Sequence, residues 1–370
     1  MPVLLKIRQH FRLRTARGLF LCVLCAALMG ALTAGASGPV HAMAEEEIIL
    51  QSNADGSVTA DLFAMDTYMS LKAYGKNAKE ALKAGAEEIR RLDRLLSTGR
   101  EDSEISVLNK DGAAVLSEDV FGLFGRALEI GEETGGIFNV TIYPVMKLWG
   151  FPEKDYRVPS EEELSAALAL ADPGSVETDQ NTRRVQFLKE GMAADLGGIA
   201  KGYTGARVTE IFREHGVDSG LVSLGGNVQA LGTKPGGKKW KVAIQDPEGG
   251  TDYLGVLEVA DEAVITSGAY ERYFEENGVR YHHIIDPADG YPADSGVVSS
   301  TIVSSDGTLA DALSTSLYIM GTEKAEEFWR ECGGTFDYVL EAEDGTLYVT
   351  EGIADRFEST RKRVTVRKDG

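Results

Sequence analysis

Cysteine is scarce in this chain, which has only three cysteines among 370 residues. Two of them, Cys22 and Cys25, lie in an apolar stretch near the N-terminus, and only Cys332 remains for the rest of the sequence. A single thiol can neither form an intramolecular disulfide framework nor build a thiolate metal cluster. Both kinds of stabilising site are therefore excluded for the body of the protein.

Positive charge is also in the minority. The chain has 38 Lys and Arg against 58 Asp and Glu, which gives a formal net charge of −20. This balance argues against a nucleic-acid partner and against binding to an anionic membrane surface, because both attract basic proteins. An anionic ligand would have to be held by local cations, by helix N-termini or through a metal ion.

Long apolar runs are absent except at the N-terminus. Residues 1–44 contain five basic and no acidic residues, an apolar stretch over 18–36, and Ala42 and Ala44 in an Ala-x-Ala pattern. This pattern predicts a secretory signal peptide, whose removal would change the net charge from −20 to −25 because five bases are lost. The apolar stretch is also near the length that spans a bilayer, so an uncleaved membrane anchor is the alternative. In both cases we expect residues 45–370 to lie outside the cytoplasm, in the periplasm or at the cell surface.

The body of the chain shows helical and strand-like segments in an irregular order. Leu82, Ile89 and Leu96 recur at helical spacing, and Ser160 with Glu163 forms the pattern of a capping box. Strand-like segments come in runs and do not alternate strictly with helices, which favours an α+β fold. No Pro- or Ser-rich linker interrupts the sequence. We therefore expect residues 45–370 to form one compact α+β domain, with antiparallel or mixed sheets and flanking helices.

Two segments contain side chains suited to metal binding or proton transfer. Asp311 and Thr315 are four residues apart on an expected helix, so they share a face and offer the hard oxygen atoms that Mg²⁺ prefers. The alternative is a surface Asp beside a Thr that bonds back to its own helix turn. His282 and His283 are adjacent on an expected strand, so only one can face a given pocket and act as a proton acceptor. The alternative is that one is a core histidine beside a plain turn.

A third segment, "DLGGIAKGY", runs from residue 195 to 203. It has neither the spacing of a phosphate-binding P-loop nor the dinucleotide-binding pattern of glycines. A glycine carbonyl here could still face a metal ion, and Lys201 could meet a phosphate as a point charge. The alternative is an ordinary strand-to-helix turn. The aromatic stretch over 136–151 could likewise wall a pocket for a flat ring or belong to the core.

The order of the motifs makes the chain resemble the ApbE family, whose members are FAD:protein FMN transferases. The resemblance spans about Met65 to Gly321 and rests on eight elements that occur in the family's order: Met65-Asp66-Thr67, "STGREDSEISVLN", "GIFNVTIYP", "DLGGIAKGY", "SLGGN", "TSGAYERY", "HHIIDPADGYP" and "DALST".

This resemblance implies a single T-fold-like α+β domain that holds FAD as substrate together with Mg²⁺. It also implies transfer of FMN from FAD to a Ser or Thr hydroxyl of a partner protein, with release of AMP. Some family members instead hydrolyse FAD to FMN and AMP. An FAD pyrophosphatase and an exported FAD-binding protein without chemistry therefore remain the alternative functions.

The same resemblance assigns roles to individual residues. It implies Mg²⁺ ligation by Asp311 and Thr315 and by the backbone carbonyl of Gly198, and a catalytic role for His283. Asp286 either orients that imidazole or caps its turn. The resemblance also implies a set of contacts to FAD, made by Met65, Ile137, Phe138, Asn139, Asp195 and Lys201.

Three positions depart from the family pattern. Gly99 stands where an aromatic residue commonly follows "ST", Asn139 replaces an Asp, and Asp66 replaces a Gly. None of them is a predicted metal ligand or the predicted catalytic histidine, so we expect activity with altered flavin contacts. The chain has no obvious copy of the acceptor motif of this family, so we do not expect it to modify itself.

Overall fold

The computed structural model describes residues 48–249 and 252–369, which fall within one compact unit, Glu47–Gly370. The signal peptide predicted for residues 1–44 lies outside the described residues. No helix in the part of the chain that is described has the length and apolar character needed to cross a membrane.

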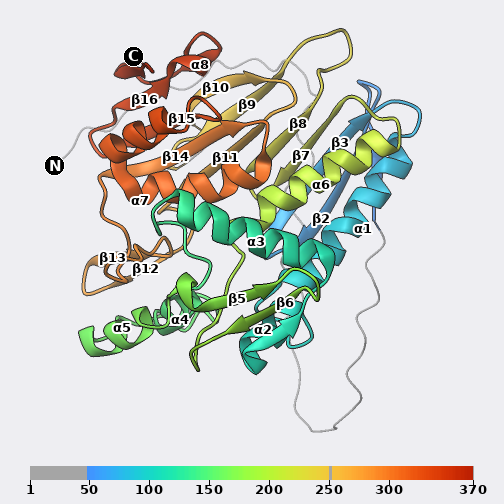
Figure 1. The fold of residues 1–370 in the computed structure, drawn as a ribbon. Coiled ribbons are helices and arrows are strands. Elements are labelled where there is room, and N and C mark those ends of the chain that lie inside the picture. The colour runs from blue at the N-terminus through green and yellow to red at the C-terminus, as the bar shows by residue number, and fades with distance from the viewer. Residues whose placement is uncertain (1–47, 250–251, 370) are drawn as a thin grey trace, which may run out of the picture. The chain divides into compact units, whose positions relative to one another are not determined.

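A ten-stranded sheet organises the fold (Figure 1). Its neighbouring strands pair antiparallel, with the exception of β16 and β18, which pair parallel. The α+β class with a mixed sheet is therefore confirmed. In spatial order the strands are β1 (Leu50–Ser52), β2 (Ser57–Ala64), β3 (Thr67–Tyr74), β7 (Gly220–Leu224), β8 (Asn227–Leu231), β11 (Ala263–Gly268), β14 (Val297–Ser304), β15 (Asp337–Ala342), β16 (Leu347–Thr350) and β18 (Val364–Arg367).

Three smaller sheets complete the strand structure. One of them packs on the large sheet: Val264 of β11 shares a core cluster with Trp240 and Val242, whereas the next residue, Ile265, packs with Leu313 on the other face. The small sheets contain β17 (Phe357–Ser359), β10 (Tyr253–Val259) and β9 (Trp240–Gln245); β12 (Tyr273–Glu276) and β13 (Val279–His282); and β4 (Ala113–Val115), β6 (Arg184–Phe187) and β5 (Val176–Asp179).

Three long helices lie side by side against the large sheet, namely α1 (Ala78–Leu96), α6 (Ala200–Glu214) and α7 (Gly307–Glu331) (Figure 1). The apolar residues that recur at helical spacing, Leu82, Ile89 and Leu96, lie on the buried face of α1. The long helix α7 breaks at Gly321, whose φ of 77° is left-handed. The remaining helices are α2 (Glu104–Asp111), α3 (Glu118–Glu133), α4 (Tyr143–Leu148), α5 (Glu161–Leu168), which has the expected capping box, α8 (Glu351–Ala354) and a 3₁₀ turn (Pro173–Ser175).

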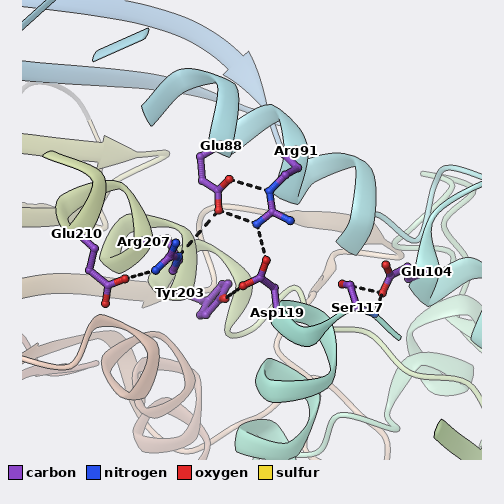
Figure 2. A network of polar contacts seen from close by, with 8 residues as sticks. All are labelled: Glu88, Arg91, Glu104, Ser117, Asp119, Tyr203, Arg207 and Glu210. Carbon is purple, nitrogen blue, oxygen red and sulfur yellow. Dashed lines mark hydrogen bonds and ion pairs between the residues drawn. The ribbon is translucent and has the colours of Figure 1, made fainter. Parts of the chain in front are cut away.

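A polar network ties three of these helices together (Figure 2). Arg91 of α1 binds Glu88 of its own helix and reaches Asp119 of α3 at 2.5 Å. Asp119 also accepts a hydrogen bond of 2.9 Å from the hydroxyl of Tyr203 on α6. Each ion pair is partly exposed and stabilises little by itself. Together they hold the first turns of α6, which carry Lys201, against α1 and α3.

Two tight hairpin turns lie beside each other at one end of the large sheet. Met65 and Asp66 join β2 to β3, and Gly225 and Gly226 join β7 to β8; all four have positive φ, as in two-residue type I′ turns. A Cβ on Gly225 would lie 2.4 Å from the Thr67 hydroxyl oxygen, so the contact between the turns requires glycine there. Asp66 adopts a left-handed φ of 58°, which aspartate tolerates better than most residues.

Helices α6 and α7 approach most closely at Gly202. A Cβ built on this residue would lie 2.1 Å from the Gly307 carbonyl oxygen and 2.6 Å from the Asp311 Cβ. The bare backbone lets the Gly202 N–H donate a hydrogen bond of 2.8 Å to Asp311 Oδ2. The packing of the two helices therefore fixes the position of a carboxylate.

We predict that Gly202→Ala destabilises the protein by about 1–3 kcal/mol, because the added methyl group forces α6 and α7 apart. Gly205→Ala is the matched control on the same helix, since its Cβ would meet only ordinary contacts of 3.6 Å and more. We expect that control to be neutral or to stabilise by about 0.5–1 kcal/mol through helix propensity. Urea unfolding measures both values, and equal stabilities of the two variants would contradict the prediction.

Candidate active site

A cavity of about 640 Å³ opens where the two hairpin turns, the start of α6, the end of β11 and the middle of α7 meet. This volume is typical of a small-molecule site. The polypeptide brings to it residues from seven separate segments of the sequence. All ten residues singled out from the sequence line this cavity: Met65, Ile137, Phe138, Asn139, Asp195, Gly198, Lys201, His283, Asp311 and Thr315.

Asp311 is buried and held rigidly at the floor of the cavity, with only 4% of its surface exposed. Its Oδ1 accepts a hydrogen bond of 2.8 Å from the Asn227 amide, and its Oδ2 accepts one from the Gly202 N–H. Burial raises the pKa of Asp311, and the charge of Lys201 opposes that shift. A carboxylate has about four acceptor sites, so two remain for a further ligand.

The other predicted metal ligands line the same cavity as Asp311. Thr315 is one turn further along α7 and also lines the cavity, as the spacing of four residues predicted. Gly198 lies under the ring of Phe138, where a Cβ would be 3.2 Å from a ring carbon. Its lack of a side chain therefore lets the loop before α6 approach the predicted flavin-binding segment.

This donor set fits Mg²⁺ better than it fits a transition metal. Among residues 48–249 and 252–369, no group of three or more His, Cys, Asp or Glu side chains is placed to hold a metal. The predicted ligand set consists of one carboxylate, one hydroxyl and one carbonyl oxygen. Mg²⁺ is commonly bound by few protein oxygens completed by water and substrate phosphates.

Lys201 is one of three cationic residues that line the cavity, with Lys154 and Arg272. Its charge acts on the carboxyl groups of Asp195, Glu271 and Asp311, and the pKa of each of these groups is raised by burial and opposed by Lys201. Asp195 is fixed by its own loop, because its Oδ1 accepts a hydrogen bond of 2.9 Å from the Gly197 N–H. A lysine beside carboxylates in a highly acidic protein is suited to meeting an anionic substrate group.

The imidazole of His283 is held as a neutral base. Its Nδ1 lies 3.1 Å from the carbonyl oxygen of Arg272. A carbonyl can only accept, so Nδ1 carries the proton and Nε2 keeps its lone pair. Burial lowers the pKa of His283 to about 3, and the positive charge of Arg272 adds to the shift. The ring of Phe151 lies edge-on to the imidazole, with the two ring centroids 6.4 Å apart.

The neighbouring histidine has a structural role. His282 is buried on the opposite side of the strand, and its Nε2 lies 3.1 Å from the Ala293 carbonyl oxygen. Its Nδ1 accepts a hydrogen bond from the Ile284 N–H. Asp286 accepts from the Ala288 N–H at 2.8 Å, so it caps the turn after the strand. The expectation that only one histidine of the pair faces the cavity agrees with this arrangement.

Asn139 is well matched to its surroundings although the family pattern has an Asp there. Its Oδ1 accepts hydrogen bonds from the N–H and the hydroxyl of Thr141, and its amide donates to the Ala171 carbonyl at 3.0 Å. A carboxylate could not make that donation. Gly99, the other notable departure, is not among the residues that line the cavity.

One wall of the cavity joins the end of the predicted motif "TSGAYERY" to a loop that the sequence did not point to. Lys154 and Tyr156 line it from the loop after α4, and Arg272 and Tyr273 line it from the start of β12. Tyr156 stacks on Phe274 with ring centroids 5.1 Å apart. The Arg272 guanidinium also donates a hydrogen bond of 2.9 Å to a backbone carbonyl of the same loop. The Gly-Phe-Pro turn signal and the aromatic residues were visible in the sequence, but nothing local showed which hairpin they would meet.

Comparison with known proteins places the chain in a family. A model of the ApbE family matches residues 65–340. The FAD:protein FMN transferase of Treponema pallidum is 34% identical over 360 residues, which covers 92% of this chain and 94% of that protein. A Klebsiella pneumoniae protein with the same description is 37% identical over 240 residues, covering 64% of this chain and 74% of that protein.

Solved structures agree. The crystal structure of the ApbE protein from Thermotoga maritima has a TM-score of 0.75 and 33% identity, covering 80% of this chain and 97% of that chain. The flavin transferase ApbE from Vibrio cholerae has a TM-score of 0.72 and 28% identity, with the same coverage. With its fold, cavity and motif order all in agreement, the chain belongs to the ApbE family.

Proposed function

We propose that this protein is an FAD:protein FMN transferase that moves FMN from FAD to a Ser or Thr hydroxyl of a partner protein, with Mg²⁺ bound and AMP released. The observation that carries the proposal is the meeting, in one cavity, of the Asp311–Thr315 pair, the Lys201 ammonium and the neutral imidazole of His283. The descriptions of the relatives support the same activity.

The binding roles follow from the walls of the cavity. Met65, Ile137 and Phe138 form an apolar side on which the flavin ring can pack. Asp311, Thr315 and the Gly198 carbonyl would hold Mg²⁺. When bound, this ion neutralises charge on the phosphate oxygens and fixes their position.

Two residues of the chain, His283 and Lys201, take part in the proposed transfer of FMN. His283 Nε2 takes the proton of the acceptor hydroxyl, whose oxygen forms a bond to the phosphorus of the FMN half of FAD. The bond between that phosphorus and the bridging oxygen breaks, so that AMP leaves with the oxygen. Lys201 offsets the negative charge on the phosphoryl oxygens, and the proton on His283 returns to solvent.

The basic and apolar leader supports the location that we propose, which is outside the cytoplasm, with membrane attachment if the leader is retained. The acceptor would then be an exported or membrane-bound protein. The strongly acidic body argues against nucleic acid as a partner.

Incubation with FAD, Mg²⁺ and a candidate exported acceptor tests the function. We expect the intact mass of the acceptor to increase by FMN minus water, and EDTA to stop the reaction. AMP with free FMN and an unmodified acceptor would instead indicate an FAD pyrophosphatase. Tight FAD binding without AMP would indicate a binding protein, and a reaction insensitive to EDTA would reject the metal.

We predict that Asp311→Asn lowers the rate of AMP release at least about 100-fold, because it removes the only carboxylate of the proposed metal set. The matched control is Asp306→Asn, which removes one charge from the N-cap of the same helix outside the cavity, where Asn caps equally well. Initial rates at several Mg²⁺ concentrations measure the effect. Wild-type activity of Asp311→Asn would eliminate the proposed metal site.

We predict that His283→Asn keeps FAD binding and loses FMN transfer by about 100-fold or more. The Asn amide can still donate to the Arg272 carbonyl, but it has no basic nitrogen in place of Nε2. His215→Asn is the control, because His215 also bonds a backbone carbonyl through Nδ1 and lies outside the cavity. Unchanged transfer by His283→Asn would remove this residue as the base.

The protonation state of His283 can be followed directly in the free enzyme. An imidazole with the ordinary pKa of 6.5 becomes charged as the pH falls through that value, whereas a group whose pKa is lowered to about 3 stays neutral until far below it. The ring C–H signal of His283, assigned by NMR with the His283→Asn variant, should therefore not move between pH 7.5 and 4.5. A titration centred near pH 6.5 would show that burial does not keep the imidazole neutral.

A further inference from the structure

Three hydroxyl groups form a continuous chain at the edge of the cavity. Ser267, near the end of β11, has its Oγ 2.7 Å from Ser314 Oγ and 3.2 Å from Thr315 Oγ1. Ser314 Oγ lies in turn 2.7 Å from the backbone carbonyl oxygen of Asp311. Ser267 and Thr315 line the cavity, whereas Ser314 is fully buried behind them.

The direction of these hydrogen bonds follows from counting protons. A carbonyl oxygen only accepts, so the single hydroxyl proton of Ser314 must point to Asp311. Otherwise two oxygen lone pairs would face each other at 2.7 Å inside the protein. Ser314 can then only accept from Ser267, which uses the proton of Ser267. The remaining bond, between Ser267 and Thr315, must be donated by Thr315.

This direction has a consequence for the cavity. The proton of Thr315 is turned toward Ser267, so the lone pairs of its oxygen are free on the side that faces the cavity. A neutral hydroxyl binds a cation through those lone pairs, and a proton pointing at the ion would repel it. The same chain ends on the backbone of Asp311, the other side-chain ligand that we propose.

We propose that Ser267 is a positioning residue that orients the Thr315 hydroxyl for binding a divalent cation. It acts through Thr315, because it donates its only proton to Ser314 and accepts the proton of Thr315. This inference rests on the metal site of the proposed function and deepens it. Residues outside the primary ligands commonly set ligand orientation in metal sites.

Binding of Mn²⁺ to the purified full-length protein without FAD tests this inference. Mn²⁺ prefers the same oxygen ligands as Mg²⁺, and the free ion is counted by electron paramagnetic resonance. We expect Ser267→Ala to weaken binding about fivefold, which corresponds to the loss of one neutral hydrogen bond. Ser267→Thr keeps the hydroxyl and should bind within about twofold of the wild type.

A matched control and a double-mutant cycle separate positioning from general damage. Thr301→Val removes a buried hydroxyl that pairs with Thr266 on the neighbouring strand, outside the chain of three hydroxyls, and should leave Mn²⁺ affinity unchanged. In a Thr315→Val background, Ser267→Ala should cost nothing further, because its effect passes through Thr315.

The outcomes distinguish this inference from the proposed function. Failure of the wild-type protein to bind Mn²⁺ both without and with FAD would overturn both the metal site and the role of Ser267. Binding by the wild type that is equal in Ser267→Ala would overturn the role of Ser267 alone. If Ser267→Ala weakened Mn²⁺ binding as much in the Thr315→Val background as in the wild type, that result would also overturn the role of Ser267, since Ser267 would then act by another route.

Discussion

The close contact between helices α6 and α7 is the constraint on which the site depends. At Gly202 the two backbones approach so nearly that no side chain fits between them, and the freed N–H binds the carboxylate of Asp311. The same contact brings the loop of Gly198 and the ammonium of Lys201 into the cavity. Because these groups come from one rigid helix pair, a shift of either helix would disturb the proposed metal ligands and Lys201 together.

Charges of both signs lie side by side in the cavity. Lys154, Lys201 and Arg272 line it together with four carboxylates, those of Asp66, Asp195, Glu271 and Asp311. Burial raises the pKa of Asp195 and Asp311, which means that their charged forms are costly until a cation approaches. The proposed binding of a metal ion together with an anionic substrate would relieve that cost. A neutral imidazole fits beside them because it adds no charge.

Backbone carbonyl groups fix the orientation of polar side chains in the cavity. The carbonyl of Arg272 selects the tautomer of His283, and the carbonyl of Asp311 sets the direction of the hydroxyl chain that ends at Thr315. In both cases a group that can only accept a hydrogen bond determines where a proton lies. Such backbone acceptors cannot be altered by mutation of their own side chains, so they are reliable anchors for catalytic geometry.

The sequence by itself determined the chemistry that is available and much of the local structure. Spacing placed Asp311 and Thr315 on one helix face, alternation put His282 and His283 on opposite sides, and the order of motifs predicted the family and the lining of the cavity. These inferences succeed because they depend on residues that are close in sequence or on motifs with a fixed order.

Only the tertiary structure decided how these groups are held. The Gly202 N–H meets a carboxylate 109 positions away, and the loop that carries Lys154 and Tyr156 meets a hairpin more than a hundred residues later. The hydrogen bond from the Asn139 amide to the Ala171 carbonyl is another contact between distant parts of the sequence. The sequence alone showed only that the carboxylate of the family pattern is missing at this position. Contacts of this type arise from the packing of whole elements, and no local pattern of residue types specifies them.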